Sequence, residues 1–144
     1  MSYNLKIHTD GGARGNPGPA AIGVVVVDSA DSRKEYYERV GETTNNQAEY
    51  LAVIFALKKV KQLLGAKQAK EATLEISIDS ELLYKQVRGE YKMMDEKLQP
   101  LFIQIWNLRQ DFKEVNFKLV PREQNKEADA LVNKALDADA QTML

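Results

Sequence analysis

Three strand patterns come before the first helix pattern, and this order limits the possible folds more than any other feature. Apolar and polar residues alternate from Leu5 to Asp10, a β-branched and apolar run extends from Ala20 to Val27, and a polar strand pattern follows from Arg33 to Val40. The glycine- and proline-rich stretch Gly11–Pro19 is expected to be irregular, and Asp28–Ser32 should form a turn. Because short connections favour antiparallel pairing, these segments predict a meander whose middle strand is buried.

Helix patterns separate the remaining strands. Beyond Gly41, which should end the third strand, we expect helices at about 45–64, 81–88, 99–112 and 126–136 and strands at 73–79 and 115–120. A strand that follows a helix should pair in parallel through a right-handed crossover. The order predicts an α/β fold with a mixed five-stranded sheet, in which three antiparallel strands are followed by two parallel ones, with helices on both faces. We expect one domain over residues 1–144, with 137–144 as a frayed tail.

Four carboxylates fall at one end of this predicted sheet. Asp10 and Asp79 each end an apolar strand pattern, Glu49 lies in the first turns of the long helix, and Asp129 lies in the first turn of the last helix. Ligands of open α/β sheets bind at the carboxyl ends of the strands. We therefore expect these side chains to meet.

Each acid also has an ordinary structural explanation. Asp10 before two glycines suits a turn, Asp79 and Ser80 suit a helix cap, and Glu49 suits a solvated helix face. Asp129 suits the N-terminus of a helix. The occurrence of all four at one end of the sheet favours a shared chemical role over four separate ones.

A carboxylate cluster constrains the chemistry. Neighbouring carboxylates raise one another's pKa values unless cations lie among them, and ligands made only of oxygen favour Mg²⁺ or Mn²⁺ over zinc. The chain has no cysteine and a single histidine, His8, which lies within the first strand pattern and is expected to be structural. The composition therefore disfavours thiol and histidine nucleophiles and favours hydrolysis assisted by two metal ions.

Four sequence motifs resemble those of ribonuclease H, type 1. They are Asp10–Pro19, Thr44–Glu49, Ile78–Ser80 and Val120–Asp129, in the order and spacing of that family. The resemblance is to the form that lacks a basic protrusion and a separate hybrid-binding domain. It implies the ribonuclease H-like fold and hydrolysis of the RNA strand of an RNA/DNA hybrid.

The resemblance also implies a role for each motif residue. Asp10, Glu49, Asp79 and Asp129 would hold two Mg²⁺ ions, for which Mn²⁺ could substitute. Arg122 stands where some relatives place a residue that assists catalysis. The residues implied in substrate binding are Gly11, Gly12, Arg14, Gly15, Asn16, Thr44, Asn45, Asn46 and Gln47. The glycines would let the backbone approach the RNA, and the short amides suit the 2′-hydroxyls of a minor groove.

The chain departs from the family at a pocket for a DNA-strand phosphate. Thr44 matches the family's threonine, whereas Glu42 and Asp95 stand by position where an arginine and an asparagine are usual. Acids in this pocket would repel the phosphate. We expect weak, strongly salt-sensitive substrate binding with a relaxed dependence on the DNA strand.

The overall charge leaves other functions open. The net charge of −1 and the pI near 5.9 are unusual for a nucleic-acid binder, so binding would rely on a local basic surface, for which the candidates are Lys58, Lys59, Lys61, Lys85 and Arg88. Alternatives are a nuclease that also cleaves double-stranded RNA, a weakly active nucleic-acid-binding domain, and an interaction domain with incidental acids. With no signal-peptide pattern and no membrane-spanning segment, we expect a cytoplasmic monomer.

Overall fold

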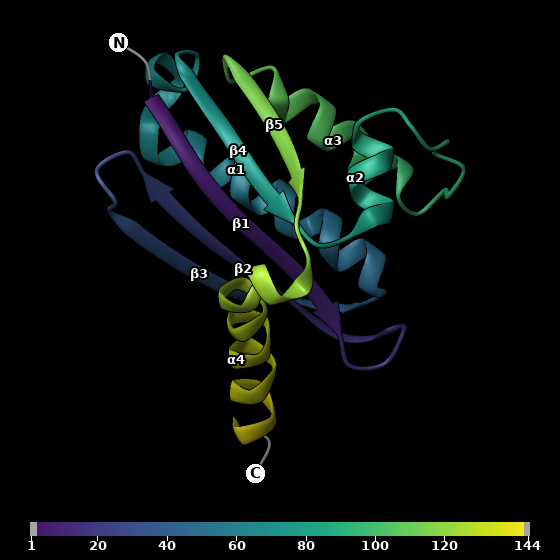
Figure 1. The fold of residues 1–144 in the computed structure, drawn as a ribbon. Helices are drawn as coiled ribbons and strands as arrows, with labels where there is room; N and C mark the ends of the chain where they lie inside the picture. The colour runs from purple at the N-terminus through teal and green to yellow at the C-terminus, as the bar shows by residue number, and fades with distance from the viewer. Residues whose placement is uncertain (1–2, 143–144) are drawn as a thin grey trace.

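The computed structural model describes residues 3–142 and shows a five-stranded mixed sheet in the order β3-β2-β1-β4-β5 (Figure 1). Its strands are β1 (Tyr3–Ala13), β2 (Gly18–Asp28), β3 (Arg33–Thr43), β4 (Ala72–Ile78) and β5 (Glu114–Leu119). β2 pairs antiparallel with β1 and β3, whereas β4 pairs parallel with β1 and β5. The predicted mixed sheet, with its outermost third strand, is confirmed.

Helices cover both faces of the sheet, as predicted. They are α1 (Asn45–Ala69), α2 (Glu81–Val87), α3 (Gln99–Arg109) and α4 (Lys126–Thr142), with one turn of 3-10 helix, η1 (Arg122–Gln124), before the last. α1 packs on one face and α3 packs on α1, while α4 crosses β1, β2 and β3 on the other face (Figure 1). Among the described residues, no helix combines the length and the apolar character that crossing a bilayer requires.

The alternation along β1 decides which residues meet which helix layer. Leu5 and Ile7 belong to the main core beneath α1, whereas His8 and Asp10 lie on the α4 face beside Val25 and Gly23. β2 is covered on both faces, and this is why its sequence is apolar without alternation. A smaller core under α4 contains Ala21, Val132, Ala135 and Leu136.

The first three strands all extend further than their sequences predict, and β2 runs from Gly18 to Asp28 rather than from Ala20 to Val27. β1 was expected to end at Asp10 but continues through the glycines to Ala13, whose N–H donates to Asn45 Oδ1 over 2.9 Å. β3 was expected to stop at Gly41 but passes through it, with φ of 79°, to Thr43. In both cases pairing with β2 supplies hydrogen bonds that outweigh the weak strand preference of glycine.

The helix ends also differ from the prediction. Gly65 does interrupt α1, with φ of 80°, but the helix resumes and runs to Ala69. α4 continues past Leu136 to Thr142, so the helix is longer than predicted and includes residues 137–142 of the expected tail; residues 143–144 lie outside the described part of the chain. No glycine or proline follows Leu136 to end this helix.

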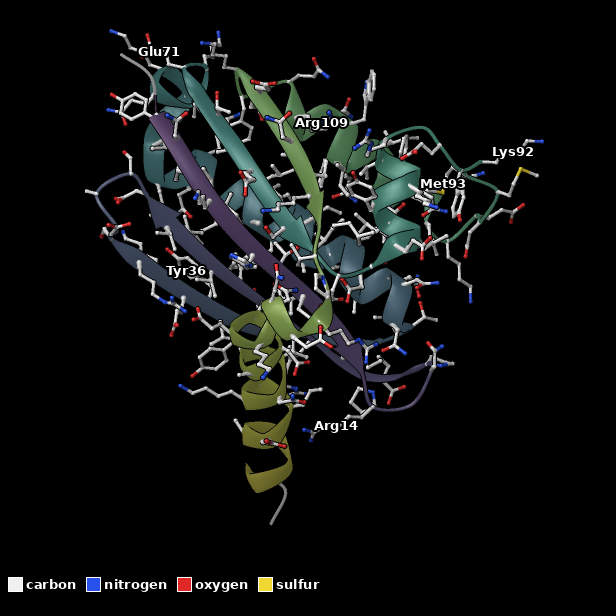
Figure 2. All side chains as sticks on the ribbon, in the orientation of Figure 1. Arg14, Tyr36, Glu71, Lys92, Met93 and Arg109 are labelled. Carbon is white, nitrogen blue, oxygen red and sulfur yellow. The ribbon has the colours of Figure 1, made fainter. Side chains whose placement is uncertain are left out.

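The connection between α2 and α3 is the loop 88–98. Figure 2 shows Lys92 at the outer edge of this loop, whereas Met93 lies nearer α2 and packs against the main core. The loop is closed at its far end by Asp95, whose Oδ1 accepts from the N–H of Lys97 over 2.8 Å. It forms one wall of a groove next to the N-terminus of α1.

Candidate active site

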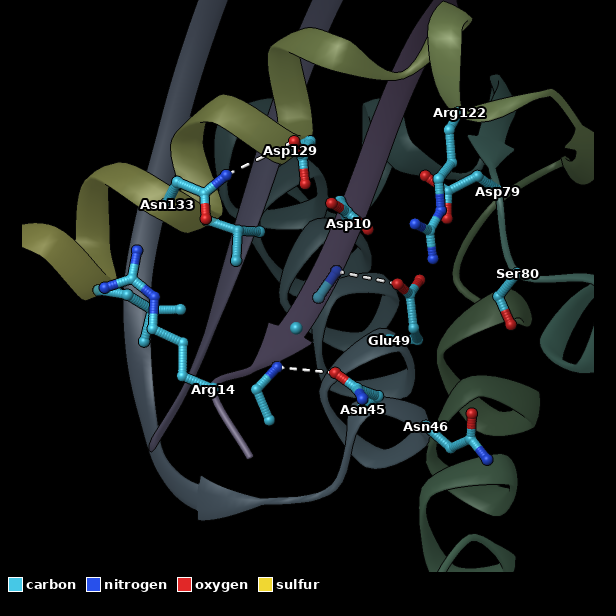
Figure 3. Close-up of a pocket in the computed structure, with 15 residues that line it drawn as sticks. Asp10, Arg14, Asn45, Asn46, Glu49, Asp79, Ser80, Arg122, Asp129 and Asn133 are labelled. Atoms are coloured by element: carbon cyan, nitrogen blue, oxygen red, sulfur yellow. Dashed lines mark hydrogen bonds between the residues drawn. The ribbon is translucent and has the colours of Figure 1, made fainter. Parts of the chain in front are cut away.

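Three carboxylates from three elements converge where β1 and β4 lie side by side (Figure 3). Asp10 comes from β1, Glu49 from the second turn of α1, and Asp79 from the residue after β4. One oxygen of each lies within 4.8 Å of the others. Asp10 and Glu49 are only 7% and 8% exposed, so these acids are part of the interior rather than of a solvated surface.

A close contact between β1 and α1 brings Glu49 to Asp10. A Cβ at Gly11 would lie 2.2 Å from the carbonyl oxygen of Ala48, so any other residue would push the helix away from the strand. The N–H of Gly11 then donates to Glu49 Oε1 over 3.3 Å. We predicted that Gly11 lets the backbone approach the RNA; the structure shows that its missing side chain makes room for α1.

The opposite face of the sheet brings the fourth acid. Gly23 on β2 is paired with Asp10, and a Cβ there would lie 2.3 Å from the carbonyl oxygen of Ala128 on α4. This close approach places Asp129 on the wall of the same pocket, where Asn133 donates to its Oδ2 over 3.5 Å. Asp129 is nevertheless outside the tight three-carboxylate group.

Burial and mutual repulsion make the acids difficult to ionise. Desolvation, together with the charges of Asp79 and Asp129, raises the pKa of Asp10 from its ordinary value of 3.8 to about 7, against the lowering effect of a hydrogen bond with Glu49. Desolvation, and then the neighbouring Asp10, raises the pKa of Glu49 well above its ordinary value. Oε2 of Glu49 is buried without a hydrogen-bond partner among the described residues.

These properties fit a divalent cation. The donors are carboxylate oxygens, the ligand type that Mg²⁺ and Mn²⁺ prefer, and one of them has no other partner. A cation among them would relieve the repulsion that raises the pKa values of Asp10 and Glu49. The predicted cluster is therefore present for three of its four acids, with Asp129 at its margin.

Polar residues surround the acids. The pocket is also lined by Arg14, Asn45, Asn46, Ser80, Arg122 and Asn133. Arg122 enters from η1, and its guanidinium extends past Asp79 into the pocket (Figure 3). Arg14 is bound to Asp137 of α4 by an ion pair of 2.6 Å, which explains its position beside that helix (Figure 2).

The amides that we predicted to bind substrate are held by the backbone. Asn45 Oδ1 accepts from Ala13, and Asn16 Oδ1 accepts from the N–H of Asn45 over 3.0 Å. Both bonds use the amide oxygen, which leaves the NH₂ groups as the donors that each residue can offer. Asn16 and Asn45 are thus fixed to the same helix end, α1, that carries Glu49.

Thr44 and Gln47 form the N-terminal cap of α1. Thr44 Oγ1 accepts from the N–H of Gln47, and Gln47 Oε1 accepts from that of Thr44. Both line a second groove together with Asn16, Asn46 and the loop residues 95–97. Of the two acids expected near Thr44, Asp95 lines this groove, whereas Glu42 is paired with Pro19 on β2 and is not among its lining residues.

The sequence interpretation missed three residues of the site. Gly23 was treated as part of an apolar run, although an isolated glycine in a strand indicates a close backbone approach. Asn125 lies within the fourth motif but was assigned no role in the site, although its side chain is buried beside Asp79. Asn133, which contacts Asp129, carried no signal beyond its spacing of one helical turn.

The chain is similar to several known proteins. A family model described as "Reverse transcriptase-like" matches residues 8–135. The "Bifunctional protein Rv2228c" of Mycobacterium tuberculosis is 39% identical over 140 residues, which is 96% of this chain but only 37% of that protein. The ribonuclease HI of Halobacterium salinarum is 40% identical over 136 residues, covering 92% of this chain and 65% of the relative.

A solved structure gives a match over nearly the whole of both chains. The structure of LC11-RNase H1 in complex with an RNA/DNA hybrid superposes with a TM-score of 0.88 and 41% identity, covering 94% of this chain and 99% of that one. The fold, the order of the motifs and these matches agree. The chain belongs to the ribonuclease H type 1 family.

Proposed function

We propose that this chain is a metal-dependent endoribonuclease that hydrolyses the RNA strand of an RNA/DNA hybrid. The observation that carries the proposal is the convergence of three carboxylates, the buried Asp10 and Glu49 and the half-buried Asp79, whose mutual repulsion a cation would relieve. The similarity to a structure that holds an RNA/DNA hybrid supports the choice of substrate. Because the chain spans little more than a third of the mycobacterial relative, the proposal concerns the activity of this domain.

The four acids would hold two Mg²⁺ ions, or Mn²⁺ in their place. When bound, such ions supply an activated water and stabilise the charge that develops on the leaving oxygen. The pKa values of Asp10 and Glu49 are raised, so a bound cation would displace their protons and the affinity for metal should increase with pH. Gly11 holds Glu49 through its N–H, so the carboxylate is oriented before a cation arrives.

Residues at and beside the N-terminus of α1 would set the position of the RNA. The NH₂ groups of Asn16 and Asn45 can donate to the 2′-hydroxyls and base edges of the minor groove, as can Asn46 at the same helix end. Arg122 brings a positive charge to the side of the pocket next to Asp79, where it would offset the charge of the cleaved phosphate.

A specific observation favours a broader substrate range as the second candidate. Asp95 lines the groove next to Thr44, which would weaken binding of a DNA-strand phosphate. Recognition would then depend mainly on the RNA strand and its 2′-hydroxyls. We infer that double-stranded RNA is a second substrate.

The deciding experiment compares labelled RNA/DNA hybrid, duplex RNA and duplex DNA, each with Mg²⁺, with Mn²⁺ and with EDTA. We expect cleavage of the RNA strand of the hybrid that needs a divalent ion and is lost in the Asp10→Asn variant. Cleavage that persists in EDTA or in that variant would overturn the mechanism. Binding without cleavage under all conditions would leave a nucleic-acid-binding domain, and neither binding nor metal dependence would leave an interaction domain.

A further inference from the structure

A buried amide lies directly behind the acidic cluster. Asn125, between η1 and α4, is only 1% exposed. Its Nδ2 donates to the carbonyl oxygen of Thr9 over 2.9 Å and to Asp79 Oδ2 over 3.0 Å. Its Oδ1 lies 3.2 Å from Nδ1 of His8. The side chain therefore connects β1, one residue before Asp10, to the acid that follows β4.

The chemistry of the partners fixes the orientation of this amide. A backbone carbonyl and a carboxylate are both acceptors, so only the NH₂ group can face Thr9 and Asp79. The amide oxygen must then face His8, whose Nδ1–H donates to it. With the ring of His8 in place, a flipped amide would direct its oxygen at two acceptors and its NH₂ at a donor, so the bond from His8 favours a single orientation.

We propose that Asn125 is the positioning residue for Asp79 and that His8, by donating to the amide oxygen, holds the amide in the orientation that Thr9 and Asp79 require; this inference rests on the proposed metal-dependent function. The bond to Asn125 engages Oδ2 of Asp79 and fixes the rotation of the carboxylate toward Asp10 and Glu49. The bond to Thr9 keeps the same amide in register with β1. Partners of this kind determine how well a ligand is presented to a metal.

Backbone bonds make the position of Asn125 independent of its side chain. Its N–H donates to the carbonyl oxygen of Arg122 over 2.9 Å, and its carbonyl oxygen accepts from the N–H of Asp129 over 3.1 Å. A substitution that removes only the amide therefore keeps the turn between η1 and α4. The side-chain effect on Asp79 can then be measured by itself.

The experiment measures binding of Mg²⁺ and Mn²⁺ alone, by calorimetry, for Asn125→Ala and Asn125→Leu. The leucine is similar in size to asparagine but offers no hydrogen bonds. We expect a loss of metal affinity of about tenfold or more in both variants. At saturating metal, kcat should fall while KM for the hybrid stays near that of the unchanged chain, since the side chain of Asn125 bonds to His8, Thr9 and Asp79 and not to a predicted substrate-binding residue.

His8 is tested by a pair of variants that leave Asn125 in place. His8→Leu removes the donor to the amide oxygen and should weaken metal binding in the same direction, though less. His8→Gln supplies an amide donor and should restore most of the affinity. Equal metal affinity for these two variants would overturn the role of His8, and this pair remains decisive if the Asn125 variants do not fold.

A matched control removes a buried hydrogen bond elsewhere. Tyr50 donates to Gln86 Oε1 over 2.5 Å between α1 and α2, on the side of α1 that faces the main core. Tyr50→Phe should lower the Tm without changing metal affinity. If the Asn125 variants behave like Tyr50→Phe, losing stability but not metal affinity, the residue is only structural and the proposal is wrong. If the unchanged chain neither binds metal nor cleaves the hybrid, the proposed function fails, and this inference falls with it.

Discussion

Asp10 and Gly23 are direct partners across the antiparallel β1–β2 ladder, so the position beside the acid on its own face of the sheet carries no side chain. The backbone of α4 lies against that space, with the carbonyl oxygen of Ala128 only 2.3 Å from where a Cβ of residue 23 would be. The distance between Asp10 and Asp129 is thus set by a glycine that takes no part in the chemistry.

Gly23→Ala should damage both stability and activity. The added methyl would overlap the backbone of α4 and push Asp129 away from Asp10, at a cost of roughly 1–3 kcal/mol. Chemical denaturation and hybrid cleavage measure the two effects. The control is Gly41→Ala, where φ is +79° but nothing lies within 4 Å of the added Cβ, so only backbone strain is introduced. Equal activity in the two variants would contradict this explanation.

Asp10→Asn should stabilise the protein without metal at neutral pH. The pKa of Asp10 is higher when folded, about 7, than its ordinary value of 3.8, so its proton favours the folded state and stability falls as pH rises between these values. Asparagine cannot ionise, so the substitution avoids this decrease in the free energy of unfolding, which is on the order of 2–4 kcal/mol above pH 7. Thermal unfolding in EDTA should show a higher Tm for the variant at pH 8 and nearly equal values near pH 4. A variant less stable than the unchanged chain at pH 8 would refute the assignment.

Bound metal should make the unchanged chain more stable than Asp10→Asn at pH 8, which reverses the order expected in EDTA. Mg²⁺ binds only the folded protein with intact acids, so it should raise the Tm of the unchanged chain and leave that of Asp10→Asn nearly the same. The same melting experiment with and without Mg²⁺ checks this. Equal shifts for both proteins would place the metal elsewhere.

Asp95→Asn should tighten binding of the hybrid. The substitution removes a negative charge from the groove beside Thr44, while the amide oxygen can still accept from the N–H of Lys97 and keep the loop closed. Anisotropy with labelled hybrid at matched salt, in an Asp10→Asn background that prevents cleavage, gives the affinity. Glu42→Arg should have a smaller effect, because Glu42 does not line the groove. Glu114→Gln, with the same charge change on β5, is the control and should leave affinity unchanged.

Arg122→Ala should lower kcat more than it changes metal affinity. Its guanidinium enters the pocket beside Asp79 but belongs to η1, outside the carboxylate cluster. We expect a fall in kcat of roughly tenfold or more, as for other charged groups that act in a transition state, with partial recovery in Arg122→Lys. Single-turnover kinetics at saturating Mg²⁺ measure the rate of the chemical step separately from the binding of substrate and metal. An unchanged kcat would make Arg122 a surface arginine only.

Local sequence patterns predicted the helices and strands of this fold well, because each kind of element gives its own periodic spacing of apolar residues. Alternation identified β1 and β4, and the glycine at 65 marked a real break in α1. The meeting of Asp10 with Asp79 followed from the rule that parallel strands place their carboxyl ends together.

The rest depends on contacts between residues far apart in the chain. Where β1 ends, the N–H of Ala13 donates to Asn45 across 32 positions, and the buried Asn125 meets His8 across 117 positions. No local pattern signals either contact. The same holds for the groove beside Thr44. Asp95 lines it and Glu42 does not, because the loop 88–98, which is distant in sequence, forms one of its walls.

The two glycine contacts, Gly11 with α1 and Gly23 with α4, lie on opposite faces of the sheet. An intermediate of folding in which only α1 had docked would contain Asp10 and Glu49 but lack the acid that α4 brings. Full affinity for metal would then appear only in the last, complete assembly of both layers. Metal binding measured during refolding would therefore report the docking of both helices. Mg²⁺ would stabilise the completely folded chain over such an intermediate.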